Sequence, residues 1–221
     1  MCVPPNVVLP VKAEVPLRAI YNQQDINACS ANVIANQILS LEGYKDYVMP
    51  SRLFQYYNSR LIDGTTTEDE GTTYRTAYKG LAKFGFCDEN IWEYTKDNVF
   101  KQPAEEGYDK ANKTLVQKYK SLVPSLYAIK YAIAQGYPVA IGVMLHENFN
   151  NLDSNFVIPP PQSCAVGGHA LLAISYNDTT RLFKVVNSWG VEWGDKGCCY
   201  MRYEDMVNPN YVFEHWCIAK E

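Results

Sequence analysis

The chain of 221 residues is long enough for one large domain or for two lobes that share a cleft, and its 47% hydrophobic content is that of a globular protein. Acidic residues outnumber basic ones by 24 to 20, and no cluster of lysine or arginine would follow a phosphate backbone. We therefore expect no nucleic acid partner. No apolar run approaches the ~20 residues that cross a bilayer, so we expect no membrane association either.

The first half of the chain has the hydrophobic spacing of helices. From Cys29 to Leu41 apolar residues recur at intervals of three and four, and Gly43 would end this helix. A connection rich in lysine and glutamate occupies about 95–120. Further helices, of which the second is ended by Gly85, are predicted over residues 51–61, 72–85 and 125–136.

The second half of the chain has the sequence pattern of β-strands. Strand-like runs separated by turn-forming residues cover 138–145, 169–176, 181–189, 198–203 and 215–219. A helical lobe over about 20–120 and a β-rich lobe over about 121–221 predict an α+β fold with an antiparallel sheet or barrel, in one domain that spans 1–221. A groove between two such lobes is a natural site.

A cysteine in the segment QQDINACSANV, residues 23–33, stands where the first predicted helix begins. An isolated cysteine is more often a small buried hydrophobe than a nucleophile, so Cys29 needs partners before it has a role. The start of a helix carries partial positive charge and free N–H groups, which favour a thiolate.

The other cysteines suggest neither a disulfide framework nor a metal site. Their total of seven is odd, and the opening segment lacks a secretory signal because prolines and charges interrupt it. We therefore expect mostly reduced thiols and a cytoplasmic location. The neighbours Cys198 and Cys199 are not accompanied by a CxxC pair, so no metal ligand set is predicted.

Three histidines are available as a base. His169 leads an apolar strand behind two glycines, whereas His146 and His215 are adequately explained as surface or packing residues. Asn187 follows an apolar run and precedes Trp189. An asparagine carbonyl can accept a hydrogen bond from one imidazole nitrogen and leave the other facing sulfur, and an indole over that bond would exclude water.

Together and in this order, the segments NQQDINACSANVIA, GGHALLAISY and NSWGVEWGDKGCCY resemble the papain-like cysteine proteases, the family of the cathepsins. The histidine lies 140 residues and the asparagine 158 residues after Cys29, which agrees with that family. The resemblance implies a papain-like fold, an active-site cleft between the lobes, protein or peptide substrates, a monomer, and no cofactor.

The resemblance also implies roles for further residues. The glutamine six residues before the cysteine, Gln23, would form an oxyanion hole with the Cys29 backbone N–H, and Gln24 is the adjacent alternative. The family's substrate-binding strand would fall on Gly71 to Thr73, where a peptide adds as a short β-strand. The residues expected to bind substrate are Gly71, Thr72, Thr73, Gly168 and Trp189.

Two positions depart from the usual family pattern. Ile26 stands where most members have a disulfide-forming cysteine, and Ser30 stands where they have tryptophan. Both departures resemble a branch of the family found in bacteria and viruses, and a viral member could be associated with the virion. Family members usually carry an inhibitory leader, and we hypothesise that residues 1–12 cover part of the cleft.

The sequence thus predicts a cysteine-type endopeptidase that works through an acyl-enzyme on Cys29. The same constellation serves an acyl or peptidyl transferase, an amidase or a thioesterase, because only the acceptor or the acyl donor differs. The remaining alternative is an inactive papain-fold module that binds other molecules.

Overall fold

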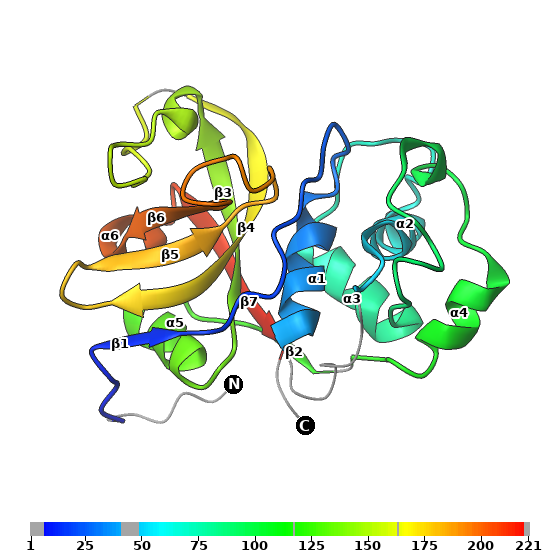
Figure 1. Ribbon diagram of the computed structural model, residues 1–221, viewed down its shortest axis with the longest axis horizontal. Coiled ribbons are helices and arrows are strands. Elements are labelled where there is room, and N and C mark those ends of the chain that lie inside the picture. The colour runs from blue at the N-terminus through cyan, green and yellow to red at the C-terminus, as the bar shows by residue number, and fades with distance from the viewer. Residues whose placement is uncertain (1–6, 41–48, 117, 163, 219–221) are drawn as a thin grey trace.

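Two parts of the molecule lie side by side, one mainly helical and one built on a sheet (Figure 1). The computed structural model describes residues 7–40, 49–116, 118–162 and 164–218. Within these ranges no helix combines the length and the apolar character needed to span a membrane. The helices are α1 (Cys29–Ser40), α2 (Arg52–Asp63), α3 (Tyr74–Phe84) and α4 (Glu105–Ala111) in the helical part, and α5 (Leu126–Ala134) and α6 (Tyr203–Met206) beside the sheet.

The described strands pair only in antiparallel fashion, in the order β2-β7-β3-β4-β5-β6, and β1 is added along β4. This arrangement confirms the predicted α+β fold with a helical lobe and an antiparallel β lobe. The strands are β1 (Lys12–Glu14), β2 (Tyr119–Ser121), β3 (Val139–His146), β4 (Ala165–Asn177), β5 (Leu182–Val186), β6 (Cys198–Arg202) and β7 (Val212–Ile218).

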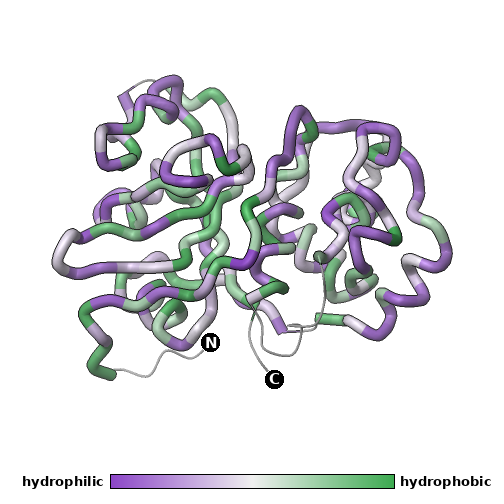
Figure 2. Tube along the Cα trace, in the orientation of Figure 1, coloured by the Kyte–Doolittle hydropathy of each residue, from purple (hydrophilic) through white to green (hydrophobic). Residues whose placement is uncertain are grey.

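Both faces of the sheet are buried. Successive positions of its strands are therefore apolar, without the alternation of a sheet that is exposed on one face. On one face Ile141 and Leu171 pack with Ile129 of α5. On the other face Leu172 packs with Ile34 of α1. Figure 2 accordingly shows hydrophobic residues along the strands and α1, and hydrophilic residues along the outer loops of the helical part.

Helix α1 is enclosed between the two parts, and residues 30–39 are all buried. Its polar side chains therefore need partners within the protein. The Gln37 side-chain amide donates to the carbonyls of Pro138 at 3.0 Å and Trp216 at 3.2 Å, and its oxygen accepts from the Tyr78 hydroxyl at 2.5 Å. These bonds hold the helix that begins with Cys29 against both the sheet and α3.

The predicted third helix begins two residues later than the periodicity indicated. Thr73 caps α3 by accepting a bond from the N–H three residues on, so Tyr74 is its first residue. Gly85 ends α3 as predicted, with φ 69° and ψ −152°, a conformation that suits glycine alone. The predicted end of the first helix, Leu41 and Gly43, lies outside the described residues.

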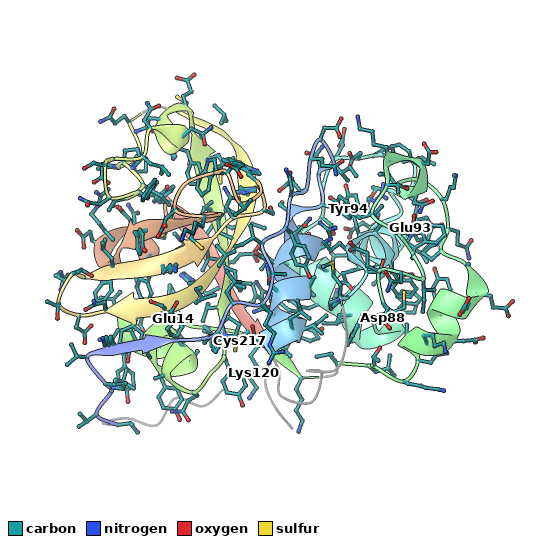
Figure 3. All side chains as sticks on the ribbon, in the orientation of Figure 1. Glu14, Asp88, Glu93, Tyr94, Lys120 and Cys217 are labelled. Atoms are coloured by element: carbon teal, nitrogen blue, oxygen red, sulfur yellow. The ribbon has the colours of Figure 1, made fainter. Side chains whose placement is uncertain are left out.

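The charged connection at about 95–120 holds more structure than the sequence suggested. It contains a short 3-10 turn, η2 (Lys96–Asn98), as well as α4 and β2. Strand β2 pairs with the end of β7, where Lys120 lies opposite Cys217; both residues are labelled in Figure 3. The sheet therefore includes residues on the helical side of the predicted lobe boundary, in β2 as well as in β1.

Candidate active site

The Cys29 thiol stands at the N-terminus of α1, where the first backbone N–H groups have no partner within the helix. Burial raises the pKa of the Cys29 thiol, and the backbone N–H groups of Ala170 and Ser30 oppose that rise by favouring the thiolate. Ala170 follows His169 in β4, so the strand that carries the histidine also contacts the sulfur. The fold thus joins the two predicted partners across 140 residues of chain.

His169 and Asn187 are hydrogen-bonded, with 2.8 Å between Nε2 of the ring and Oδ1 of the amide. The ring is only 7% exposed, and Trp189 stacks on it with 5.0 Å between the ring centroids. The indole therefore lies where the sequence placed it, over the imidazole and its bond. Phe149, from the 3-10 turn η3 (Glu147–Asn150) after β3, packs in turn against the edge of Trp189 at 5.7 Å.

The neighbouring backbone fixes which atom of the Asn187 amide faces the ring. Oδ1 also accepts a hydrogen bond from the Ser188 backbone N–H at 2.8 Å, and an amide nitrogen in that place could not accept it. Because Oδ1 only accepts, the hydrogen in its bond to His169 belongs to ring Nε2. In the neutral ring Nδ1 is therefore left unprotonated and able to accept a proton.

Burial also acts on the charge of the histidine. It lowers the pKa of His169 to about 4, and the bond from Asn187 opposes that fall by stabilising the imidazolium. Burial thus disfavours a charge on either Cys29 or His169 taken singly. A thiolate and an imidazolium side by side attract each other, and this attraction works against both burial effects.

Gln23 is buried, with 8% of its surface exposed, while Gln24 is exposed and has a left-handed backbone with φ 55°. The Gln23 side chain is held at both ends. Its Oε1 accepts from the Ser188 hydroxyl at 2.6 Å, and its Nε2 donates to the Ile26 carbonyl at 3.0 Å. One of the two N–H groups of the amide is thereby used, which leaves the other for an oxyanion.

The backbone of Gln23 is anchored to both parts of the molecule. On the β side its N–H donates to the Ser188 carbonyl at 2.7 Å. On the helical side its carbonyl accepts from the hydroxyl of Tyr94, labelled in Figure 3, at 3.0 Å. The centroid of the Tyr94 ring lies 3.7 Å from the guanidinium carbon of Arg52, which is buried and forms an ion pair with the partly buried Glu89 at 2.7 Å. These contacts fix the segment before the nucleophile.

A cavity of about 540 Å³ opens beside the thiol and the imidazole. Four of the five predicted substrate-binding residues line it, and Trp189 does not, because it packs on His169 instead. Four acidic side chains, here called the cavity carboxylates, line it as well, although the sequence did not single them out. The lining includes Cys29, His169, Gly71, Thr72, Thr73, Gly168 and the cavity carboxylates Asp63, Glu68, Glu70 and Glu214.

The described N-terminal segment lies away from this cavity. Strand β1 pairs with β4 so that Lys12 faces Asn177, and the Val7 backbone N–H donates to the Tyr127 hydroxyl on α5 at 3.0 Å. No residue from 7 to 14 lines the cavity. The hypothesis that the start of the chain covers the cleft is therefore wrong for residues 7–12, and residues 1–6 lie outside the described part.

Ser188 is a site residue that the sequence analysis missed. It follows Asn187 directly, and it contacts both the amide that orients His169 and the amide predicted to bind the oxyanion. Its place between Asn187 and Trp189 is the signal that could have drawn attention to it.

Comparisons with known proteins identify the family of the chain. The family model described as "Papain family cysteine protease" matches residues 12–218. An uncharacterized peptidase C1-like protein of Acanthamoeba polyphaga mimivirus is 32% identical over 214 residues, which cover 90% of this chain and 69% of that protein.

Solved structures agree as well. Xylellain, a cysteine protease from Xylella fastidiosa, matches with a TM-score of 0.89 and 30% identity over 97% of this chain and 87% of its own. The digestive procathepsin L 3 of Tenebrio molitor larval midgut shares the fold, with a TM-score of 0.76 and 14% identity over 98% of this chain and 72% of its own. The viral and bacterial relatives fit the branch that the sequence resembles. The chain belongs to the papain family of cysteine proteases.

Proposed function

We propose that the protein hydrolyses peptide bonds within protein or peptide substrates, through an acyl-enzyme on Cys29. The observation that carries this proposal is the hydrogen bond between His169 and Asn187 at the edge of a cavity that Cys29 shares. In this scheme Cys29 is the nucleophile, His169 the acid and base, Asn187 the residue that orients the ring, and Gln23 an oxyanion donor.

The resting site holds the thiol proton on the imidazole. His169 Nδ1 takes the proton, and the resulting imidazolium and thiolate stabilise each other, while the N-terminus of α1 and the N–H groups of Ala170 and Ser30 stabilise the sulfur further. Together these attractions offset the burial that acts on each group singly. The thiol with a neutral imidazole and the thiolate with an imidazolium each hold one proton. Moving this proton between the two groups therefore leaves the number of bound protons unchanged.

In acylation the thiolate sulfur attacks the peptide carbonyl carbon, and the carbonyl electrons move to oxygen. The free N–H of the Gln23 amide and the backbone N–H of Cys29 donate to that oxyanion. The loss of one such donor typically costs about 3–4 kcal/mol, or 10²–10³ in rate. As the C–N bond breaks, the imidazolium of His169 gives its proton to the departing amine and leaves a thioester.

In deacylation a water molecule gives a proton to neutral His169 as its oxygen attacks the thioester carbonyl. The C–S bond then breaks, the carboxylic acid leaves, and the Cys29 thiolate is restored beside His169, which keeps the proton taken from water. We propose that the peptide lies along Gly71, Thr72, Thr73 and Gly168, which line the cavity beside the thiol. Gly168 leaves room there, since an added Cβ would meet its nearest neighbour only at 4.0 Å.

Purified protein tests this function on a library of peptides of mixed sequence, with cleavage sites mapped by mass spectrometry. We expect internal cleavage in the unaltered protein and none in Cys29→Ala or His169→Ala. Added amines in the same reactions separate the alternatives, since a transferase yields amide products and a hydrolase yields free carboxylates. Absence of any cleavage or transfer, with the protein folded, would favour the inactive binding module.

A further inference from the structure

The segment between α2 and α3 forms one wall of the cavity and is fixed to the nucleophile segment by hydrogen bonds. The backbone N–H of Asn27, two residues before Cys29, donates to the two carboxylate oxygens of Asp69 at 3.1 and 3.3 Å. The Asn27 side-chain amide donates to the Asp69 backbone carbonyl. Asp69 itself is absent from the cavity lining, so its carboxylate serves the protein and not the cavity.

The same carboxylate is connected to the predicted substrate-binding glycine. The Tyr56 hydroxyl donates to Asp69 Oδ1 at 2.6 Å and accepts from the Gly71 backbone N–H at 3.1 Å. A second observation shows how close the two segments are, because a Cβ added to Gly71 would meet the Asn27 carbonyl at 3.5 Å. A continuous chain of bonds thus runs from Asn27 through Asp69 and Tyr56 to Gly71.

This chain rests on a rigid base within α2. Tyr56 is fully buried, and burial together with the nearby Asp69 raises the pKa of its hydroxyl, which therefore keeps the proton that it donates. One turn later the fully buried Arg60 lies over the Tyr56 ring at 4.0 Å and donates to the Glu68 carbonyl at 2.6 Å. The wall is therefore joined to α2 by side chains that are themselves buried.

No disulfide joins the two segments in the described residues, and Ile26 packs in an apolar cluster with Tyr56. We propose that Asp69 is a positioning residue, whose hydrogen bonds to Asn27 and Tyr56 set the distance between the Cys29 nucleophile and the peptide bound along Gly71. This inference rests on the proposed function. It matters because an error of about 1 Å in the approach of reacting atoms can cost ~10²-fold in rate.

Two rates measured on the same variants test the inference. The first is kcat/KM for a peptide long enough to lie along Gly71, and the second is the rate constant for alkylation of Cys29 by iodoacetamide, which needs the thiolate but not the wall. Asp69→Asn keeps the size of the side chain, but it removes the negative charge and puts an NH2 group in place of one of the two oxygens that accept from Tyr56 and Asn27. We expect kcat/KM to fall at least tenfold and alkylation to change less than threefold. Asp97→Asn, an exposed position in the helical part, is the charge-matched control and should alter neither rate.

A change in kcat/KM of less than twofold would overturn the inference, and so would an equal fall in both rates, which would mean that Asp69 supports the nucleophile or the fold itself. If Asp69→Asn does not fold, Tyr56→Phe carries the same test, because it removes the hydroxyl and keeps the buried ring. The unaltered protein separates the two proposals. Absence of hydrolysis there refutes the proposed function and this inference with it, whereas hydrolysis that Asp69→Asn and Tyr56→Phe leave intact refutes this inference alone.

Discussion

Replacing Asn187 with alanine removes the acceptor that His169 Nε2–H uses at 2.8 Å. The ring is almost fully buried beneath Trp189, so water does not readily replace the lost oxygen. The hydrogen bond matters most when the ring is charged, and hydrogen bonds to charged groups contribute about 1.5–3 kcal/mol. We therefore expect kcat to fall about ten- to 150-fold in Asn187→Ala.

The direction of the pKa change gives this prediction a second readout. The bond from Asn187 raises the pKa of His169 against the effect of burial, so its loss lowers that pKa further. Asn187→Asp is the matched control, since it keeps an acceptor in place and adds a negative charge that raises the pKa of the imidazolium. Activity on the basic side of the pH profile depends on the imidazolium, so that limb should move to lower pH in Asn187→Ala and to higher pH in Asn187→Asp.

The assay is the pH profile of kcat for a peptide substrate from pH 4 to 10, with thermal unfolding of each variant measured in the same buffers. A value of kcat within threefold of the unaltered protein in Asn187→Ala would overturn this prediction. So would a basic limb that stays in place in both variants, because the bond would then not act through the protonation of His169.

Three further predictions concern stability and substrate charge. Burial opposes a second proton on the folded pair of Cys29 and His169, whereas the unfolded chain holds a thiol proton and, below pH ~6.5, an imidazolium proton as well. The unfolded state therefore binds more protons at low pH, and the free energy of unfolding should fall by up to about 1.4 kcal/mol per pH unit from pH 6.5 to 4 in urea titrations. His169→Gln should flatten this slope, and an unchanged slope would contradict the assignment. Glu89→Ala should destabilise the protein by about 3–5 kcal/mol, because Arg52 is left buried without its carboxylate, whereas a loss below 1 kcal/mol would show that the pair is solvated. The cavity carboxylates should make KM lower for peptides with lysine or arginine near the scissile bond than for neutral ones, by a factor that shrinks as salt rises from 0.05 to 0.5 M; equal KM values at low salt would contradict this prediction.

Much of the fold could be predicted from local pattern. The helical period over α1, the glycine that ends α3 and the apolar runs of β3 and β4 are all features of neighbouring residues, and each has the predicted type of structure. The charged connection was harder, because β2 is a three-residue strand that owes its form to pairing with β7. A pattern within those three residues carries no such information.

The residues of the candidate site also differ in how far local sequence pattern predicts them. Cys29, His169 and Asn187 each stand at the start or end of a predicted element, and the structure brings all three to one place. Asp69 had no such signal, since its role comes from a bond to a residue 42 positions earlier in the chain. Trp189 packs on the imidazole, as the sequence analysis expected, and does not line the cavity, so its contact with a substrate stays a prediction.

Whether Cys29 is a thiolate paired with His169 can be measured by labelling with limiting iodoacetamide at pH 5.5, followed by peptide mapping of all seven cysteines. An ordinary thiol, with a pKa of about 8.5, is almost wholly protonated at that pH and reacts slowly. We predict rapid alkylation at Cys29 alone, lost in His169→Ala. Equally slow alkylation at all seven cysteines in the folded protein would show that Cys29 is not a thiolate paired with His169.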